Sequence, residues 1–176
     1  MIEKNKYGRR DENMSKDILF KTDDFVFSYR VGGIIINNGK ILLQKPKDDD
    51  YAIIGGHISS LETTADTLIR EFKEELHADI EIERLMAVGE IFFPWGNKPC
   101  HQICLYYKVS LTEGNNIPME GSFWGYDELD NQRVDLEYCW VPLEDLKKGL
   151  KVYPLELMPH VLEERNEIVH FISKEI

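Results

Sequence analysis

Residues 63–76 combine a helical apolar pattern with a tight group of acidic side chains. Apolar residues recur at the spacing of one helix face, namely at Ala65, Leu68, Ile69, Phe72 and Leu76. Thr63 stands where an N-cap residue is expected, and Asp66, three positions later, is its capping partner. The segment therefore predicts an amphipathic helix that packs against a larger core.

Glu71, Glu74 and Glu75 lie on the polar side of this predicted helix. With about 100° of rotation per residue, all three carboxylates are expected to point away from the apolar face. Like charges three or four positions apart repel each other, so such a group lowers helix stability unless positive charge balances it. A bound divalent cation would supply that charge, whereas a solvated acidic surface is the plainer alternative.

Strand and turn signals occupy much of the remaining chain. Within residues 25–45, two runs rich in β-branched and aromatic residues flank Asn38-Gly39, which predicts a hairpin because both residues accept positive φ. The double glycine Gly55-Gly56 predicts a loop whose backbone can approach a ligand closely. Further strands are expected at 51–54, 80–93, 100–111 and 134–141.

The ends of the chain and one internal stretch differ in character from the strands. Residues 1–22 predict a polar N-terminal extension, and 112–132 predict a loose acidic segment. Pro142 is expected to open a short helix, and residues 159–176 predict a C-terminal helix. Its inward-facing residues would be Val161, Leu162, Ile168, Val169 and Ile172. Residues 23–176 are thus expected to form one α+β domain, with helices against a mixed sheet.

The charge and the cysteine content limit the classes of partner and compartment. A length of 176 residues suits one domain, and a formal net charge of −11 disfavours a nucleic-acid polymer, whose phosphates would be repelled. Cys100, Cys104 and Cys139 form neither a C-x-x-C pair nor an even set, so we expect reduced thiols in a cytoplasmic protein. Strand alternation would place His101 on the opposite face from Cys100 and Cys104, which disfavours a zinc site. No apolar run is long enough to span a membrane.

A long spaced motif surrounds the acidic helix. Gly56, five spacer residues, Glu62, seven spacer residues and the segment 70–75 (REFKEE) follow one another in that order. This motif resembles the signature of the Nudix hydrolases, and every charged position of that signature matches. The order of hairpin, strands and the segment 140–146 (WVPLEDL) extends the resemblance to about residues 25–150. The resemblance implies an α/β/α sandwich with a mixed β-sheet between helices.

The sequence departs from the family pattern at three positions. His77 replaces the glycine that usually ends the helix, so we expect a different helix end. Phe72 stands where alanine or leucine is common and needs more room beneath the helix. Ile54 replaces the proline that often precedes the double glycine. None of these changes removes a carboxylate, so the resemblance is to a divergent member with its acidic residues intact.

The resemblance also implies a metal and a set of catalytic residues. Magnesium, with manganese as a substitute, would be bound by Glu71, Glu74, Glu75 and the carbonyl of Gly56, since Mg²⁺ prefers oxygen ligands. Arg70 joins the three glutamates as a catalytic residue, because an ion pair four positions along the helix would orient Glu74. Glu62 would hold the preceding loop to the helix.

Further site residues are expected outside the motif. Glu137 is the favoured additional metal ligand, with Glu120 and Asp127 as alternatives. Substrate-binding residues are expected where backbone can approach a phosphate or an aromatic ring can stack on a base, namely at Gly55, Gly56, Tyr51 and Trp95.

The function implied is magnesium-dependent hydrolysis of a pyrophosphate bond in a nucleoside diphosphate linked to another group. The substrate would be a small nucleotide derivative, with no membrane partner. One alternative is a non-catalytic Nudix-like domain that senses a nucleotide, and another is an interaction protein whose acidic helix is only surface. The sequence leaves open the identity of the nucleotide, the general base and the number of metal ions. It also leaves open whether a homodimer forms through residues 1–22 or the C-terminal helix.

Overall fold

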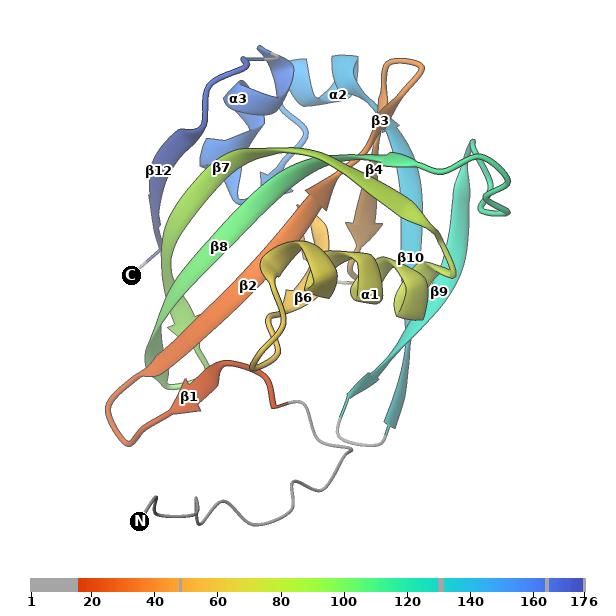
Figure 1. The fold of residues 1–176 in the computed structure, drawn as a ribbon. Coiled ribbons are helices and arrows are strands. Elements are labelled where there is room, and N and C mark those ends of the chain that lie inside the picture. The colour runs from red at the N-terminus through yellow and green to blue at the C-terminus, as the bar shows by residue number, and fades with distance from the viewer. Residues whose placement is uncertain (1–15, 48, 130–131, 164, 176) are drawn as a thin grey trace, which may run out of the picture.

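The computed structural model describes residues 16–47, 49–129, 132–163 and 165–175, without the side chains of 127–129, 132 and 133. Strands dominate this part of the chain, and the helices are few and mostly short (Figure 1). They are α1 (Thr64–Leu76), α2 (Leu143–Lys147), the 3-10 helix η1 (Leu155–Leu157) and α3 (Met158–Leu162). Among the described residues, no helix is both long and apolar enough to cross a bilayer.

Within the described residues, the strands form two six-stranded sheets rather than one. The first contains, in spatial order, β1 (Leu19–Lys21), β2 (Val26–Ile34), β8 (Lys98–Leu111), β7 (Ile80–Trp95) and β12 (Val169–Lys174), with β6 (Ile54–His57) paired to β2. The second contains β11 (Val152–Tyr153), β5 (Tyr51–Ala52), β4 (Lys40–Lys45), β10 (Gln132–Pro142) and β9 (Ser122–Leu129), with β3 (Ile36–Asn37) paired to β4. Both sheets mix parallel and antiparallel pairs, which confirms the α+β class and the mixed pairing.

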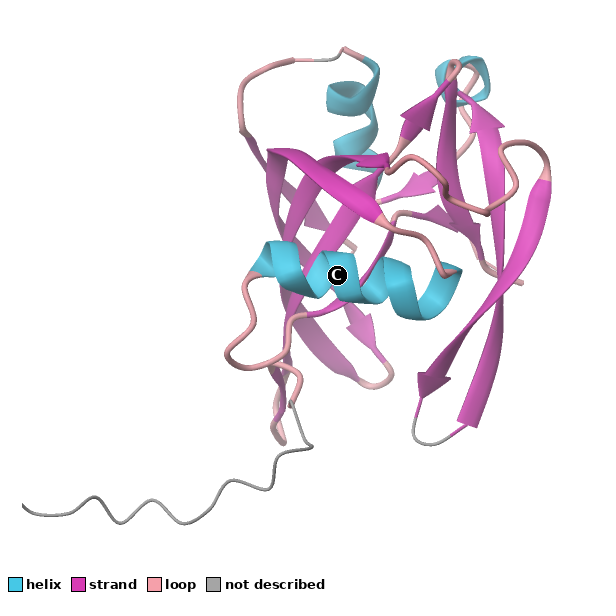
Figure 2. Cartoon of the chain, turned by 45° about the vertical axis from the view of Figure 1, so that its right-hand side comes forward, coloured by secondary structure: helices cyan, strands magenta, loops and turns pink. Residues whose placement is uncertain are grey.

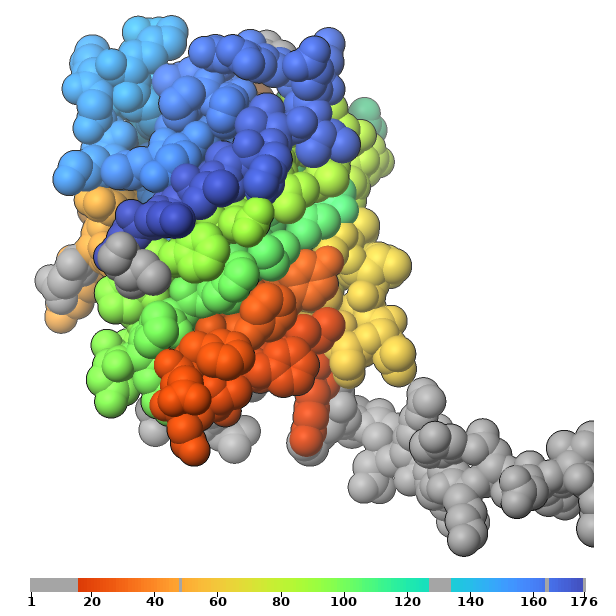
Figure 3. Space-filling model, turned by 90° about the vertical axis from the view of Figure 1, so that its left-hand side faces the viewer, coloured from red at the N-terminus to blue at the C-terminus, as the bar shows by residue number. Residues whose placement is uncertain are grey.

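The helices lie at different sides of the two sheets. Helix α1 crosses in front of β2 and β6 and ends near β9, whereas α2 and α3 both lie toward the opposite end of the molecule (Figures 1 and 2). On another face, β12, β7, β8 and β2 run side by side as diagonal stripes at the surface (Figure 3). The two sheets and α1 therefore create two apolar layers, one between the sheets and one beneath the helix.

The layer beneath α1 is built around one aromatic ring. Phe72 is fully buried, together with Leu68 from the preceding turn. The extra room that Phe72 needs comes from Gly33 on β2, because a Cβ at that position would lie only 2.6 Å from the phenyl ring. A glycine on the strand thus allows a large ring on the helix.

Both ends of α1 are set by local hydrogen bonds. The Thr63 side chain accepts a hydrogen bond from the amide of Asp66 at 3.1 Å, as the sequence predicts. His77 adopts the left-handed conformation, with φ of 55°, and the amide of Ala78 reaches the carbonyl of Phe72. The expectation of a different helix end was therefore wrong, because histidine takes the backbone conformation that glycine usually supplies.

Three predicted segments need correction. The predicted C-terminal helix is wrong: after the short α3, residues Val169–Lys174 form β12, parallel to β7. Their burial alternates, with Phe171 inside and Ile172 exposed, which is the period of a strand. The predicted 1–22 extension contains β1, and residues 1–15 lie outside the described part. The loose segment 112–132 contains β9, while the hairpin at Asn38-Gly39 is confirmed.

Replacing Phe72 by alanine is expected to lower the free energy of unfolding by about 3–5 kcal/mol, because the cavity left between α1 and Gly33 cannot close. Ile69 provides the matched control on the same helix, since it is 41% exposed. Ile69→Ala should cost less than about 1 kcal/mol. Urea denaturation of both variants measures the difference, and equal losses would contradict this packing.

Candidate active site

Strand β6 places its two glycines on opposite faces. Gly56 faces α1, and a Cβ there would lie 2.2 Å from the carboxyl carbon of Glu71. Gly55 is the register partner of Gly32 on β2, and its missing side chain would point to the other face of β6. A Cβ at Gly55 would lie 2.0 Å from the carbonyl oxygen of Val31. The double glycine is therefore part of a strand, not the predicted loop, and it permits two close approaches that any side chain would block.

Arg70 gathers the acidic residues of the motif around its guanidinium. Its Nη1 donates to Glu71 at 2.8 Å and to Glu74 at 3.0 Å. Its Nε and Nη2 donate to Glu62 at 3.1–3.2 Å, and Glu62 also accepts from the hydroxyl of Thr67 at 2.9 Å. The predicted ion pair with Glu74 and the predicted tie between Glu62 and the helix are both present.

The network shifts the pKa values of its members in the directions that strengthen it. Partial burial of Arg70 acts to lower its pKa, but hydrogen bonds to Glu62 and Glu74 and the charges of Glu71 and Glu62 raise it above its ordinary value. Desolvation acts to raise the pKa of Glu62, and the hydrogen bonds from Arg70 and Thr67 outweigh it, so the pKa is lowered. Both groups are therefore held in their charged forms.

Glu75 differs from the other two glutamates of the helix. Only 5% of it is exposed, so the expectation that all three carboxylates point away from the apolar face was wrong for this residue. The hydroxyl of Tyr138 on β10 donates to Glu75 at 2.7 Å. Gly125 on β9 lies against the same turn of helix, since a Cβ there would be 2.3 Å from the Glu75 carbonyl oxygen. The β9–β10 hairpin thus closes over the end of α1.

The donor set suits a hard divalent cation. The carboxylate of Glu71 lies beside the strand that carries Gly56, and Glu74 is held to the same arginine as Glu71. Carboxylate and carbonyl oxygens are the ligands that Mg²⁺ prefers. No three His, Cys, Asp or Glu side chains within the described ranges already form a cluster that could hold a metal ion. Because Mg²⁺ commonly uses only one or two protein carboxylates and completes its shell with water and phosphate, the residues still fit the ion.

Two of the three candidates for an additional ligand form ion pairs with lysines. Glu137 forms an ion pair with Lys45 at 3.6 Å, whereas its neighbour Tyr138 is the β10 residue that faces α1. Strand alternation therefore directs Glu137 away from the helix. Glu120 is exposed and pairs with Lys40 at 3.9 Å. The side chain of Asp127 lies outside the described residues.

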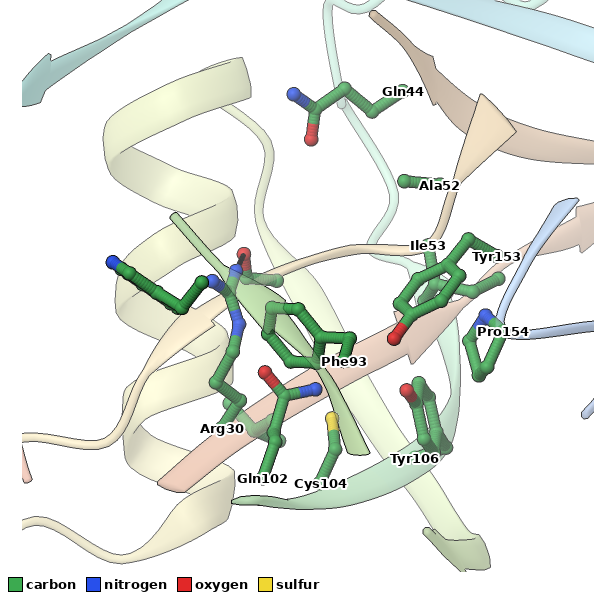
Figure 4. Close-up of a pocket in the computed structure, with 14 residues that line it drawn as sticks. Arg30, Gln44, Ala52, Ile53, Phe93, Gln102, Cys104, Tyr106, Tyr153 and Pro154 are labelled. Carbon is green, nitrogen blue, oxygen red and sulfur yellow. Dashed lines mark hydrogen bonds between the residues drawn. The ribbon is translucent and has the colours of Figure 1, made fainter. Parts of the chain in front are cut away.

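A cavity of about 250 Å³ lies between the two sheets, on the Gly55 side of β6 (Figure 4). Its lining residues come from β2, β4, β5, β6, β7, β8 and β11 and from the positions just after β5 and β11: Arg30, Val31, Gly32, Gln44, Ala52, Ile53, Gly55, Phe93, Trp95, Gln102, Cys104, Tyr106, Tyr153 and Pro154. Two predicted substrate-binding residues, Gly55 and Trp95, line it. Tyr51 instead borders a second hollow, together with Lys45 and Glu137.

Polar groups in and beside this cavity are distinctive. Arg30 donates from Nη2 to the carbonyl of Gly55 at 2.9 Å. The hydroxyl of Tyr153 is buried and has no hydrogen-bond partner among the described residues. Beside the cavity, burial and then the positive charges of Arg30 and Lys21 lower the pKa of His57 to about 4. Two positively charged side chains, Arg30 and Lys21, therefore act on His57 beside the cavity.

The cysteines and His101 are placed as strand alternation predicts. Cys100 and Cys104 are buried, whereas the ring of His101 packs against Phe92 at 4.5 Å and near Phe27 at 6.0 Å. Burial raises the pKa of both thiols, that of Cys104 to about 11, so they are poor metal ligands. All three cysteines are free thiols.

Sequence reasoning missed two residues of this region. Arg30 is a lone cation within the apolar run FVFSYRVGGIII, and that contrast was a usable signal. Tyr138 directly follows Glu137, so choosing between them required knowledge of which strand face meets the helix. Phe93 also lines the cavity, beside Tyr153, with the two ring centroids 6.4 Å apart.

Solved structures resemble this fold. An ADP-ribose pyrophosphatase from Streptococcus suis matches with a TM-score of 0.55 and 18% identity, covering 83% of this chain and 98% of that one. A MutT protein from Bacillus halodurans matches with a TM-score of 0.54 and 16% identity, covering 84% and 91%. A UDP-X diphosphatase matches with a TM-score of 0.51 and 18% identity, covering 81% and 66%. These likenesses confirm the α+β sandwich fold.

A search of curated proteins found no significant match. The family model of the NUDIX domain matches residues 27–161, a range that contains both the acidic helix and the strand with the two glycines. Because this match covers most of the chain, the protein belongs to the NUDIX family of hydrolases.

Proposed function

We propose that the protein hydrolyses a pyrophosphate bond in a nucleoside diphosphate linked to another group, with Mg²⁺ as its cofactor and Mn²⁺ as a substitute. The observation that carries this proposal is the arrangement around β6. One face of this strand meets the carboxylate of Glu71, and the other face borders the 250 Å³ cavity. A ligand bound in the cavity would thus extend its phosphates over the strand edge to the acidic residues.

The chain's own residues account for binding and for proton transfer. Water attacks one phosphorus atom, the bond to the bridging oxygen breaks, and each product keeps a phosphate. One of Glu71, Glu74 and Glu75 accepts the proton of the water. Glu71, Glu74 and the Gly56 carbonyl would hold Mg²⁺, with Glu75 fixed nearby by Tyr138. When bound, the ion shields the negative charge of the phosphates and lowers the pKa of water.

The size of the cavity supports a substrate of which only one part, a base or a sugar, enters the cavity. Pockets for complete drug-sized ligands are about 300–1,000 Å³, so 250 Å³ suits a base or a sugar better than a whole dinucleotide. Relatives of similar fold are an ADP-ribose pyrophosphatase and a UDP-X diphosphatase, whose names both describe a nucleoside diphosphate joined to a second group. The net charge of −11 further favours a small substrate over a nucleic-acid polymer.

A non-catalytic, nucleotide-sensing domain is the second candidate. It is favoured by the contacts of Arg70, which satisfies Glu71 and Glu74 without a metal. A hydrolysis screen of nucleoside diphosphate sugars, ADP-ribose, dinucleoside polyphosphates and nucleoside triphosphates distinguishes the two functions. The assay contains Mg²⁺ or Mn²⁺, and products are identified by mass. Nucleotide binding without turnover in either metal would favour the sensor.

The cytoplasmic location and the homodimer remain predictions.

Glu74→Gln is expected to lower kcat/KM by at least about 100-fold, because the variant loses a carboxylate that serves the metal or the attacking water. Glu81→Gln makes the same chemical change at an exposed position on β7 and should leave the rate unaltered. The substrate identified in the screen is used for both. A fully active Glu74→Gln enzyme would contradict a catalytic role for the acidic helix.

Tyr138→Phe removes one hydroxyl and keeps the buried ring. The variant removes one hydrogen bond that orients the Glu75 carboxylate. Changes of this kind typically lower metal affinity or activity by about 10- to 100-fold. The Mg²⁺ concentration that gives half-maximal rate should rise accordingly. Phe123→Leu, which alters a ring packed near Tyr138, serves as the control for a general loss of packing.

Glu62→Gln is expected to lower the free energy of unfolding by about 1 kcal/mol at pH 7, the upper range for partly exposed ion pairs. The folded state lowers the pKa of Glu62 below 4.5, so this contribution is complete above pH 4.5 and is lost as the pH falls through the folded-state pKa. Urea denaturation of both proteins at pH 7 and at decreasing acidic pH measures it. A constant difference over that range would show that charge is not its source.

A further inference from the structure

The cavity carries a single formal charge on its lining residues. Arg30 supplies it, and no aspartate or glutamate belongs to the described lining. No carboxylate within the described part of the chain forms an ion pair with Arg30, whose hydrogen bond is to a neutral carbonyl. In a protein with a net charge of −11, a half-buried guanidinium with no acidic partner among the described residues is an unusual feature. An anionic ligand would complete its hydrogen bonding.

Arg30 also stands at the junction between the cavity and the acidic residues. The Gly55 carbonyl that it binds precedes Gly56, whose Cα lies against Glu71. Lys21 adds a second positive charge at this end, because its ammonium group lies 5.6 Å from the ring centre of Trp95, which lines the cavity. The guanidinium of Arg30 therefore binds the short strand that separates the cavity from Glu71.

We propose that Arg30, with Lys21 near it, binds the phosphate that stays on the nucleoside monophosphate product, while the nucleoside occupies the cavity. This inference rests on the proposed hydrolysis, and it specifies the orientation in which the substrate binds. The nucleoside-bound phosphate is held by Arg30, and the second phosphate, with the group attached to it, lies at the carboxylates of α1. The bond between the bridging oxygen and one of these two phosphorus atoms breaks, and water supplies the new oxygen.

The remaining walls of the cavity suit a base. Gln44 presents an amide group that can donate and accept, as the edge of a base requires. Gln102, whose oxygen accepts from the hydroxyl of Ser28 at 3.4 Å, offers its amide nitrogen as a donor. The Tyr153 hydroxyl has no described partner and is directed toward Phe93 and Tyr106 (Figure 4). A buried hydroxyl without a hydrogen bond lowers stability, and a polar atom of the base would satisfy it. Phe93 offers a flat apolar surface for the ring.

A purely structural role for Arg30 is the competing explanation. The guanidinium would then serve only to hold the Gly55 carbonyl in place. Two substitutions separate these roles. Arg30→Gln keeps an N–H donor for the carbonyl but removes the charge, whereas Arg30→Lys keeps the charge and loses the forked geometry. A phosphate site depends on the charge, and a structural hydrogen bond does not.

The test is equilibrium dialysis with AMP, UMP, adenosine and uridine, in EDTA so that no metal contributes. For the nucleotide that binds more tightly, Arg30→Gln should raise the dissociation constant by about 10- to 100-fold, as expected for the loss of charge-assisted hydrogen bonds to phosphate. The same variant should change binding of the matching nucleoside by less than about twofold. Arg30→Lys should retain more of the nucleotide affinity than Arg30→Gln.

Several results would overturn the inference. The first is unchanged nucleotide binding by Arg30→Gln, and the second is an equal loss of nucleotide and nucleoside affinity in that variant. The third is an equal loss of nucleotide affinity in Arg30→Lys and Arg30→Gln. The fourth is that the wild-type protein binds neither nucleotide at about 10 mM. Arg84→Gln, which removes an arginine at a separate hollow, controls for the change in net charge. Glu74→Gln should bind the nucleotide normally in EDTA while losing hydrolysis, so failure of the phosphate site and failure of the proposed reaction are distinguishable.

Discussion

The guanidinium of Arg70 is the contact on which the acidic site depends. Without it, Glu62, Glu71 and Glu74 would be like charges on a short helix and the segment before it, and their repulsion would oppose the fold. Its N–H groups donate to all three carboxylates at 2.8–3.2 Å. One cation therefore offsets the repulsion among the three carboxylates. Four glutamates and one arginine still leave a formal charge of −3 on these side chains, with Glu75 included. That excess is what a divalent cation would balance.

Strand β6 turns this charged helix into part of a larger site. Because successive residues of a strand face opposite sides, Gly55 and Gly56 open different faces of the same short element. The absence of a side chain at Gly56 lets Glu71 lie against the backbone, and its absence at Gly55 lets the strand lie close to β2. Two consecutive glycines thus place the Glu71 carboxylate and the cavity on opposite faces of the same short strand.

The sequence predicted best what depends on local spacing. The cap at Thr63, the hairpin at Asn38-Gly39 and the Arg70–Glu74 contact follow from interactions within a few residues, and all are present. The C-terminal strand was mistaken for a helix because its partner, β7, lies about eighty residues earlier in the chain and provides its hydrogen bonds. Glu75 and Tyr138 meet only after β10 packs over α1, so no local pattern identifies that pair.

The distribution of charge explains how an acidic protein can bind an anion. Repulsion from a net charge of −11 acts at long range and is screened by salt beyond about 8–10 Å, whereas binding is decided by the groups in contact. At the cavity those groups are Arg30 and Lys21, and on the other face of β6 they are carboxylates that attract a divalent cation. A diphosphate that spans the strand would meet a guanidinium at one phosphate and a metal ion at the other. The acidic surface would then repel long polyanions while this short path accepts a small one.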